Sequence, residues 1–212
     1  MRGRNGFFRV TVLGLAVVLF ISGCESFFTS NAFSGLQRDP ANMSAAELEI
    51  FAADALASGD RTTIKKTFDA LLKATEGSTR TASQTSTLVE LGVAATGIPQ
   101  LLTAVVAADG DLEGLDADAL LSGFDSATAK LTADIALAAD PGTLTGQQYA
   151  YAALGLVGAI GAEAESFEAL SGADGIDDAQ TLLGLSIAAY EAEGKEDSET
   201  YQLLIDLQGQ IT

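Results

Sequence analysis

Apolar residues recur every three or four positions along most of this chain, which is the spacing that places side chains on one face of an α-helix. The first such segment is 44–58, and its apolar face consists of Leu48, Phe51, Ala52 and Ala55. Ser44 and Glu47 have the spacing of a capping box, in which each side chain bonds the other residue's free backbone amide. The sequence therefore predicts a helix that starts at about Ser44.

A second helix is predicted directly after the first one. Gly59 suits the left-handed turn that ends a helix, and Asp60 suits the cap of the next helix. The second segment runs to about Thr75, and its apolar face consists of Ile64, Phe68, Leu71 and Leu72. The two segments together predict a helical hairpin.

Residues 78–87 are small and polar, and they are interpreted either as a loop or as the solvated start of a third helix. The third helix itself carries Leu88, Val89, Leu91, Val93 and Ala94. Pro99 interrupts this pattern, and because proline suits a first helical turn, we expect a new helix from Pro99 to about Ala108.

A longer helix is predicted over 116–139, with one continuous apolar stripe. The stripe consists of Ala117, Leu120, Leu121, Phe124, Ala127, Leu131, Ile135 and Ala138. Asp140, Pro141 and Gly142 follow, and such turn-forming residues are expected to end the helix.

The next predicted helix, 149–162, is apolar almost all round, and a second capping box, Thr145 with Gln148, precedes it. A helix that is apolar on every side is expected to lie in the centre of the core. Two more helices are predicted over about 177–193 and from Asp197 onward.

Three glycines in the helix 149–162 call for an explanation, because glycine inside a helix costs about 1 kcal/mol relative to alanine. Gly155, Gly158 and Gly161 lie three positions apart. We expect another backbone to approach them closely. The alternative is a small ligand on this face, with Tyr149 and Tyr151 at its edge.

The pattern and the composition together define the fold class. The chain of 212 residues is 48% hydrophobic and 19% charged, which is globular composition. No segment alternates in the way that a half-buried strand does. We therefore expect an all-α fold, in which antiparallel helical hairpins form a bundle or a short array of about seven or eight helices.

The first residues follow a different pattern. Arg2, Arg4 and Arg9 precede an apolar run from Val10 to Ile21. A positive start followed by a short apolar run is typical of a secretory signal. The run is shorter than the roughly 20 residues that a membrane-spanning helix needs.

The apolar run closes with Ile21, Ser22, Gly23 and Cys24, and Cys24 is the one cysteine in the chain. This ending resembles the lipobox of bacterial lipoproteins, in which an aliphatic residue and two small residues precede a lipidated cysteine. The resemblance implies that 1–23 is a cleaved signal peptide and that Cys24 carries acyl chains such as palmitate, which anchor the protein in a membrane. An ordinary signal peptide with a chance cysteine is the alternative.

The same resemblance bears on location. Glu25 follows the cysteine where lipoproteins retained in the inner membrane often have an aspartate. This implies the periplasmic face of the outer membrane, or the cell surface, in preference to the inner membrane.

The residues after Cys24 divide into two parts. Residues 24–42 are interpreted as a lipidated tether and 43–212 as a single all-helical domain. The tether contains Phe27, Phe28 and Phe33, which either rest in the membrane interface or pack back on the domain.

The predicted hairpin over about 45–78 also resembles a tetratricopeptide unit. The residues that agree in order are Leu48, Phe51, Ala52, Ala55, Ile64, Phe68 and Leu71. Ile64 stands where the family has a small residue in its second helix, and Glu76 stands in place of its closing proline. The resemblance implies a helical-repeat array that acts as an adaptor; another helical hairpin would share much of the pattern.

The charge of the chain excludes one class of partner. There are 11 basic and 29 acidic residues, and cleavage before Cys24 removes three of the arginines. Eight basic residues then face 29 acidic ones, which leaves side chains with a charge of about −21. Such a surface repels phosphate backbones and anionic lipid head groups, so we expect no nucleic-acid partner; the simpler role of the acidity is solubility.

Residues suited to catalysis or metal binding are scarce. The chain has no histidine, which is the commonest general base and metal ligand. The acidic stretch from Asp109 to Asp118 has a glycine at the sixth position of a calcium loop, Gly114, but Leu120 takes the place of the closing glutamate. A serine–lysine pair is the one catalytic arrangement left open. We therefore expect no enzyme, no metal and no cofactor.

These observations lead to two functional hypotheses. The first is a lipid-anchored extracytoplasmic scaffold that binds protein partners, as an adaptor in envelope assembly or transport. The alternative is a periplasmic carrier of a small ligand or lipid, built around the glycine-lined helix 149–162.

Overall fold

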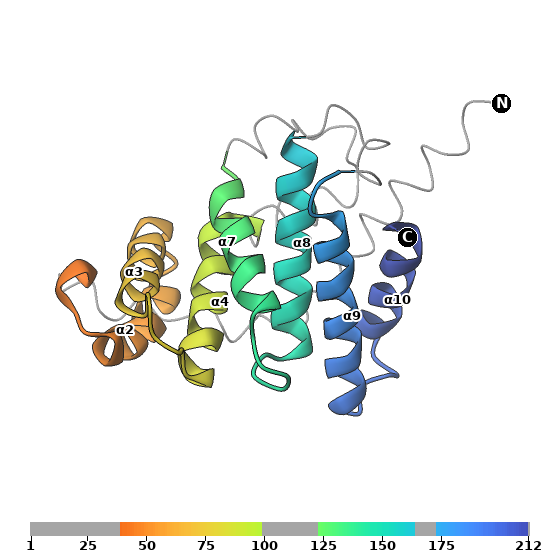
Figure 1. Cartoon of the computed structure of the whole chain (residues 1–212), viewed down its shortest axis with the longest axis horizontal. Coiled ribbons are helices and arrows are strands. Elements are labelled where there is room, and N and C mark those ends of the chain that lie inside the picture. Colours follow the sequence, from red (N-terminus) through yellow and green to blue (C-terminus); the bar gives the residue numbers. More distant parts are fainter. Residues whose placement is uncertain (1–38, 99–122, 164–172, 212) are drawn as a thin grey trace.

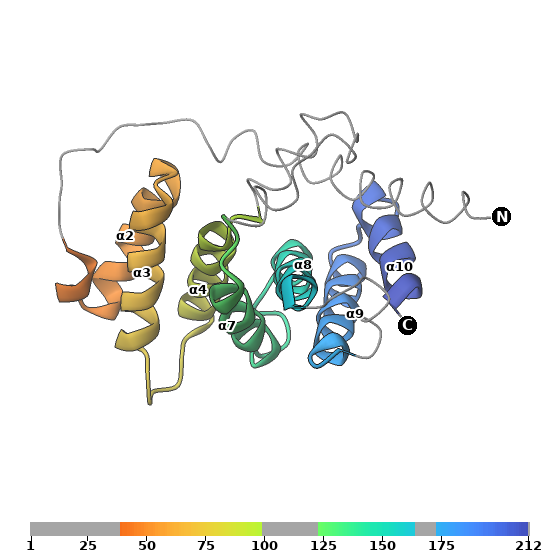
Figure 2. The ribbon, with the colours of Figure 1, turned by 90° about the horizontal axis from the view of Figure 1, so that it is seen from above.

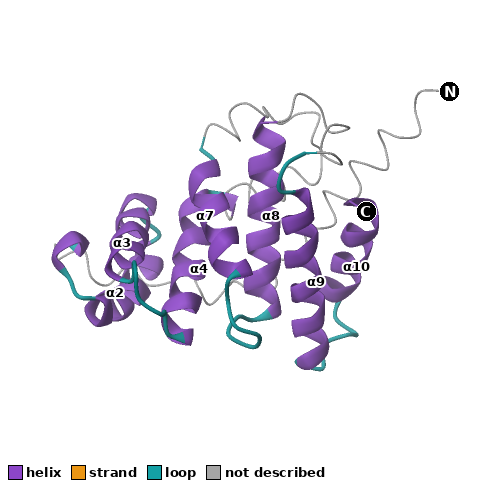
Figure 3. Cartoon of the chain, viewed as in Figure 1, coloured by secondary structure: helices purple, strands orange, loops and turns teal. Residues whose placement is uncertain are grey.

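The computed structural model describes residues 39–98, 123–163 and 173–211. All regular structure in these ranges is helical, with seven α-helices and one short 3-10 helix, which confirms the all-α fold (Figure 3). The elements are η1 (Pro40–Asn42), α2 (Ala45–Ser58), α3 (Arg61–Ala74), α4 (Ala82–Thr96), α7 (Ser126–Leu137), α8 (Gly146–Glu163), α9 (Ile176–Ala192) and α10 (Glu199–Ile211). The helix expected over 99–108 lies outside the described residues.

The first hairpin begins and ends where its caps predict. The hydroxyl of Ser44 accepts from the amide of Glu47, and the Glu47 carboxylate accepts from the amide of Ser44. Gly59 has a φ of 65° and ends α2, because this left-handed conformation suits glycine. Asp60 then caps α3 by accepting from the amides of Thr62 and Thr63.

The start of α4 decides between the two interpretations of 78–87. A third capping box, Thr81 with Gln84, opens this helix, so its first turns belong to the helix and only 78–81 form a loop. Thr85 is buried, which shows that the polar stretch packs on the core. The helix ends at Thr96, and Gly97 follows with a φ of 88°.

The prediction of one continuous helix over 116–139 is wrong. Gly123, Phe124 and Asp125 are not helical, and the helix proper starts at Ser126. Asp125 caps α7, since its carboxylate accepts from both the amide and the hydroxyl of Thr128. The apolar spacing continued across this cap and concealed it.

The predicted apolar stripe of this helix is wrong at three of its described residues, whereas Ile135 is buried as predicted. Leu131 is 42% exposed, and Ala127 and Ala138 are exposed as well. The buried face consists of Thr128, Ala129, Thr132, Ala133, Ile135 and Ala136. Small and β-branched side chains are buried here because α7 packs closely against both α4 and α8.

Contacts between helix ends show that successive helices run in opposite directions. Arg61 at the start of α3 bonds Ala95 at the end of α4, and Asp125 before α7 bonds Thr96. The start of α8 lies beside the end of α9, where Gly146 bonds Glu193. These pairs confirm an antiparallel arrangement of successive described helices.

The helices form a row with two layers (Figures 1 and 2). Each helix packs mainly on the described helices before and after it, from α2 and α3 at one end to α9 and α10 at the other. Additional contacts join α2 to α4, α4 to α8, and α7 to α9. The row therefore alternates, with α2, α4 and α8 in one layer and α7 and α9 in the other, as Figure 2 shows from above.

The helix α8 is the centre of the row, as its apolar sequence predicted. It packs on α7, α9 and α4, and its buried residues include Ala150, Ala153 and Ala159. Among the described helices none is long and apolar enough to cross a membrane, although α8 is the longest, with 18 residues.

Candidate functional site

The residue with the most specific predicted role, Cys24, lies outside the described residues, as does the acidic stretch from Asp109 to Asp118. The remaining candidates are the glycines and tyrosines of α8. All of them lie in the described part of the chain, so their surroundings can be stated.

The atoms that lie nearest to the glycines of α8 belong to side chains, and at Gly155 one of them is the Cβ of Ala129, which is bonded to the backbone of α7. A Cβ atom built on Gly155 would lie 3.0 Å from Ile98 Cδ1 and 3.6 Å from Ala129 Cβ. On Gly158 it would lie 3.2 Å from Phe124 Cζ, and on Gly161 it would meet nothing within 4 Å. The protein itself fills the space beside the first two glycines.

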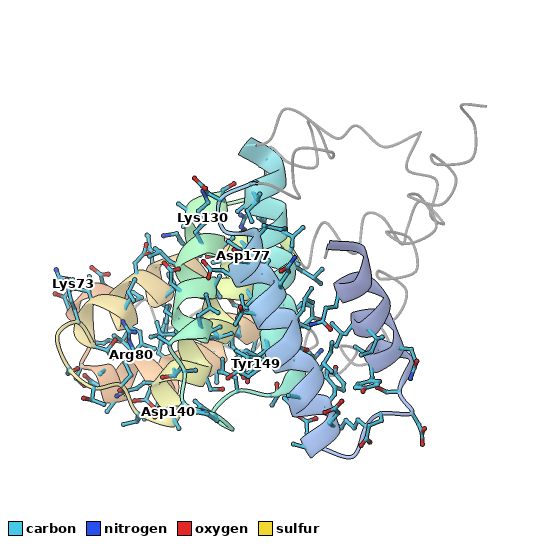
Figure 4. All side chains as sticks on the ribbon, turned by 45° about the vertical axis from the view of Figure 1, so that its right-hand side comes forward. Lys73, Arg80, Lys130, Asp140, Tyr149 and Asp177 are labelled. Atoms are coloured by element: carbon cyan, nitrogen blue, oxygen red, sulfur yellow. The ribbon has the colours of Figure 1, made fainter. Side chains whose placement is uncertain are left out.

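The tyrosines of α8 have different surroundings. Tyr149 is only 3% exposed, and its burial raises the pKa of the phenol above the usual value. Figure 4 labels Tyr149 between the elements of the row. Tyr151 is partly buried against the core, and its hydroxyl oxygen accepts a hydrogen bond from Gln147 Nε2 at 3.4 Å. Tyr149 is therefore a core residue and does not edge an open site.

Polar side chains join the three helices of the α2–α4–α8 layer, and sequence reasoning missed them. The Glu49 carboxylate accepts from Ser83 Oγ at 2.8 Å and from Gln84 Nε2 at 3.0 Å. Gln148 Nε2 donates to Ser86 Oγ at 2.7 Å and to Glu90 Oε1 at 3.0 Å. In the sequence, these contacts could have been expected from long polar side chains that stand next to buried positions in otherwise apolar helices.

The electrostatics of this layer centre on Glu90. Desolvation by burial raises the pKa of its carboxyl, and the hydrogen bond from Gln148 opposes that rise. No arginine or lysine is among the groups that shift it. The hydrogen bond between Gln148 and Glu90 fixes the spacing of two helices.

A second junction joins α8 to α9. Ser186 Oγ donates to the Gly146 carbonyl at 2.6 Å, and the Glu193 carboxylate accepts from the Gly146 amide at 3.2 Å. A Cβ atom on Gly146 would overlap the Tyr190 ring. The hydrogen bond from Lys195 lowers the pKa of Glu193. These contacts lock the start of α8, and Ser186 is buried and bonded within them.

One surface feature stands out on the first α-helix of the row. Ile50 is 76% exposed on α2, and it is the most exposed of the large apolar residues that the structure describes. Ala46, Ala53 and Ala57 are exposed at helical spacing from it. We call these four residues the outer stripe of α2. In the sequence, Ile50 stands between the core positions Leu48 and Ala52, so helical spacing places it away from the core. This position was the feature of the sequence that indicated an exposed apolar residue.

The described residues hold no group of three or more acidic or cysteine side chains that could bind a metal ion. Comparison of the chain with protein families, curated proteins and solved structures found no match. The functional argument therefore rests on the residues of this chain.

Proposed function

We propose that this protein is a lipid-anchored extracytoplasmic scaffold that binds protein partners. The anchor is Cys24, which closes a signal-like segment in the pattern of a lipobox. The helical row supplies the scaffold, and the tetratricopeptide-like order of residues in α2 and α3 agrees with an adaptor that acts in envelope assembly or transport.

The observation that carries the binding role is the outer stripe of α2. Stacked helical arrays need a polar outer face on their terminal helices, because the last helix has no neighbour to cover it. The outer face of α2 instead presents Ile50, with its side chain 76% exposed. Burial of such a side chain in a complex is favourable by about 1.5–3 kcal/mol.

The carrier function has less support. A ligand on the glycine face of α8 would need space beside Gly155 and Gly158. Ile98, Ala129 and Phe124 occupy that space. The side chains that would have to move belong to α7 and to the segments just before α7 and after α4.

The anchor is tested by substitution of the one cysteine. We expect Cys24→Ala to release the protein from the membrane fraction and to abolish labelling by a fatty-acid analogue. Ser22→Ala, which keeps a small residue beside the cleavage site, is the matched control and should stay anchored and labelled. Unchanged membrane attachment without label would disprove the anchor.

The binding role is tested by cross-linking in intact cells. A photoreactive amino acid at Ala53, on the outer stripe, should give one reproducible cross-linked protein. Adding Ile50→Glu should remove that product, because a charge on the stripe opposes apolar contact. The same photoreactive residue at exposed Ala192, on α9, is the control. A product from Ala53 that survives Ile50→Glu, or no product, would contradict the proposed surface.

A further inference from the structure

The basic residues of the domain are concentrated in one element. Of the eight that follow Cys24, four lie on α3, namely Arg61, Lys65, Lys66 and Lys73. The helix contains one acid, Asp69, which is paired with Lys65 at 2.6 Å. In a chain with an excess of acids, α3 is therefore a helix of net positive charge.

Two of these lysines are available to a partner. Lys66 and Lys73 are exposed and lie seven positions apart, which places them on the same face of α3. Neither forms an ion pair with a described residue. The hydrogen bond from the Thr63 side chain is the largest cause that lowers the pKa of Asp60, and the charge of Lys66 contributes a smaller part. Glu76 follows Lys73 by three positions, just beyond the end of α3. Figure 4 labels Lys73 and Arg80 at the same end of the row.

The opposite end of the row is acidic. The helices α9 and α10 and their link contain one basic residue, Lys195, and it is paired with Glu193. Their acids are Asp177, Asp178, Glu191, Glu193, Glu196, Asp197, Glu199 and Asp206. The helix α3 and the pair α9–α10 therefore carry charges of opposite sign, although α2 beside α3 has three acids, Glu47, Glu49 and Asp54, and no basic residue.

The domain is joined to its predicted anchor beside the basic helix α3. The 3-10 helix η1 packs on α3, and Pro40 within it is buried. Cys24 precedes η1 by only 16 residues. The membrane that the lipid on Cys24 enters is therefore within reach of α3.

We propose that α3 is the face with which the anchored domain meets a membrane of anionic lipids, with Lys66 and Lys73 contacting the head groups. This inference rests on the proposed lipid anchor. The acids of α9 and α10 are repelled by the same surface, so attraction of α3 and the stronger repulsion of the α9–α10 end turn the row in one direction. The domain without its anchor does not bind such a membrane, because its net charge is negative.

The orientation is measured on the acylated full chain bound to vesicles. The acylated sulfur of Cys24 does not react with thiol labels, so an introduced cysteine is labelled alone. A fluorophore is placed at exposed Thr62→Cys on α3 or at exposed Ala188→Cys on α9. Quenching by a head-group quencher is then compared in phosphatidylcholine vesicles with and without phosphatidylglycerol.

With phosphatidylglycerol, we expect quenching at position 62 to exceed that at position 188 several-fold. The ratio should fall toward one without the anionic lipid, and also at about 1 M salt, where charges are screened over about 3 Å. Lys66→Gln with Lys73→Gln should lower it. Thr181→Glu with Ala192→Glu changes the net charge by the same amount at the acidic end and should not lower it.

Each contrary result overturns a stated part of the argument. An acylated protein that does not float with the vesicles overturns the anchor and this inference together. A protein that floats with a ratio near one, or with a ratio that the two lysine substitutions leave unchanged, overturns this inference alone. A ratio near one in vesicles that rises only in native membranes would show a protein partner on α3 and would equally overturn it.

Discussion

Gln148 on α8 and Glu90 on α4 are joined by a hydrogen bond of 3.0 Å between Nε2 and Oε1. The Oε1 atom of the same glutamine accepts from the amide of Thr145 at 2.9 Å. One side chain therefore caps its own helix and also fixes the distance to a parallel one. The capping role was predicted from the sequence, whereas the contact with α4 was not.

This pair makes a pH-dependent contribution to stability. Burial raises the pKa of Glu90, so the folded state holds that proton more tightly than the unfolded state does. The stability contributed by protonated Glu90 is present at low pH and is lost as the pH rises above 4.5, the ordinary value of the carboxyl, through the raised value.

We therefore expect Glu90→Gln to be more stable than the wild type at neutral pH, by about 0.5 kcal/mol for a half-buried carboxyl. The difference should vanish below about pH 4, where the wild-type carboxyl is protonated in both states. Urea unfolding at the two pH values measures it. A Glu90→Gln protein that is less stable at neutral pH would contradict the unfavourable burial of the charge.

Asp125 makes a contribution to stability whose pH dependence has the opposite sign to that of Glu90. Burial acts to raise the pKa of this carboxyl, but hydrogen bonds from Thr128 outweigh it, and the pKa is lowered. Its contribution is present above the unfolded pKa and is lost as the pH falls through the folded value. We expect Asp125→Ala to cost about 1 kcal/mol at neutral pH, as the loss of a helix cap does.

The Asp125→Asn protein is the matched control for that measurement, because asparagine caps helices about as well as aspartate without a charge. It should keep most of the stability and lose the pH dependence. Equal losses for both substitutions at every pH would show that the cap does not depend on the carboxylate.

A side chain on Gly158 of α8 would press against the Phe124 ring. A Cβ atom there would lie 3.2 Å from the Phe124 ring, so we expect Gly158→Leu to destabilise the fold by about 1–3 kcal/mol without a change in helical content. Gly161→Leu is the control, because a Cβ there meets nothing within 4 Å. Circular dichroism with thermal unfolding compares them; stabilisation by Gly158→Leu would show that this face is open.

Gly92 on α4 lies against Thr132 on α7. A Cβ atom on Gly92 would overlap Thr132 Oγ1 and lie 3.1 Å from Phe68 Cε2. We expect Gly92→Ala to destabilise the fold by about 1–3 kcal/mol. Thr132→Ala in the same protein should restore part of the loss, with a coupling of at least about 0.5 kcal/mol in a double-mutant cycle. Strict additivity would mean that the two residues do not touch.

The sequence predicted what depends on neighbouring residues in the chain. The capping boxes at Ser44 and Thr145 and the glycine at position 59 locate helix ends through contacts within a single turn. These features therefore placed α2, α3 and the start of α8 correctly.

The incorrect predictions concern features that depend on contacts between residues far apart in the sequence. The break before Asp125 interrupts a run whose apolar spacing continues across it, so periodicity alone gave one helix. Thr132 is buried and Leu131 is exposed because α4 and α8 lie close on either side of α7. The sequence of α7 alone does not show how closely α4 and α8 lie to it.

The candidate surfaces were predictable only in part. The charges of α3 and the phase of Ile50 are present in the sequence, but their significance depends on which helices lie at the ends of the row. That order is set by packing between helices far apart in the chain, such as α4 with α8.

The two-layer row has a consequence for how the molecule opens. The hairpin of α2 and α3 is held to the other helices mainly through α4, whereas α8 is held from three sides. Opening of α2 and α3 breaks one interface and leaves the centre intact, so their amide protons exchange with solvent sooner than those of α8. The end of the molecule that carries the outer stripe and the basic helix is thus free to fray and refold while the middle of the row keeps its shape.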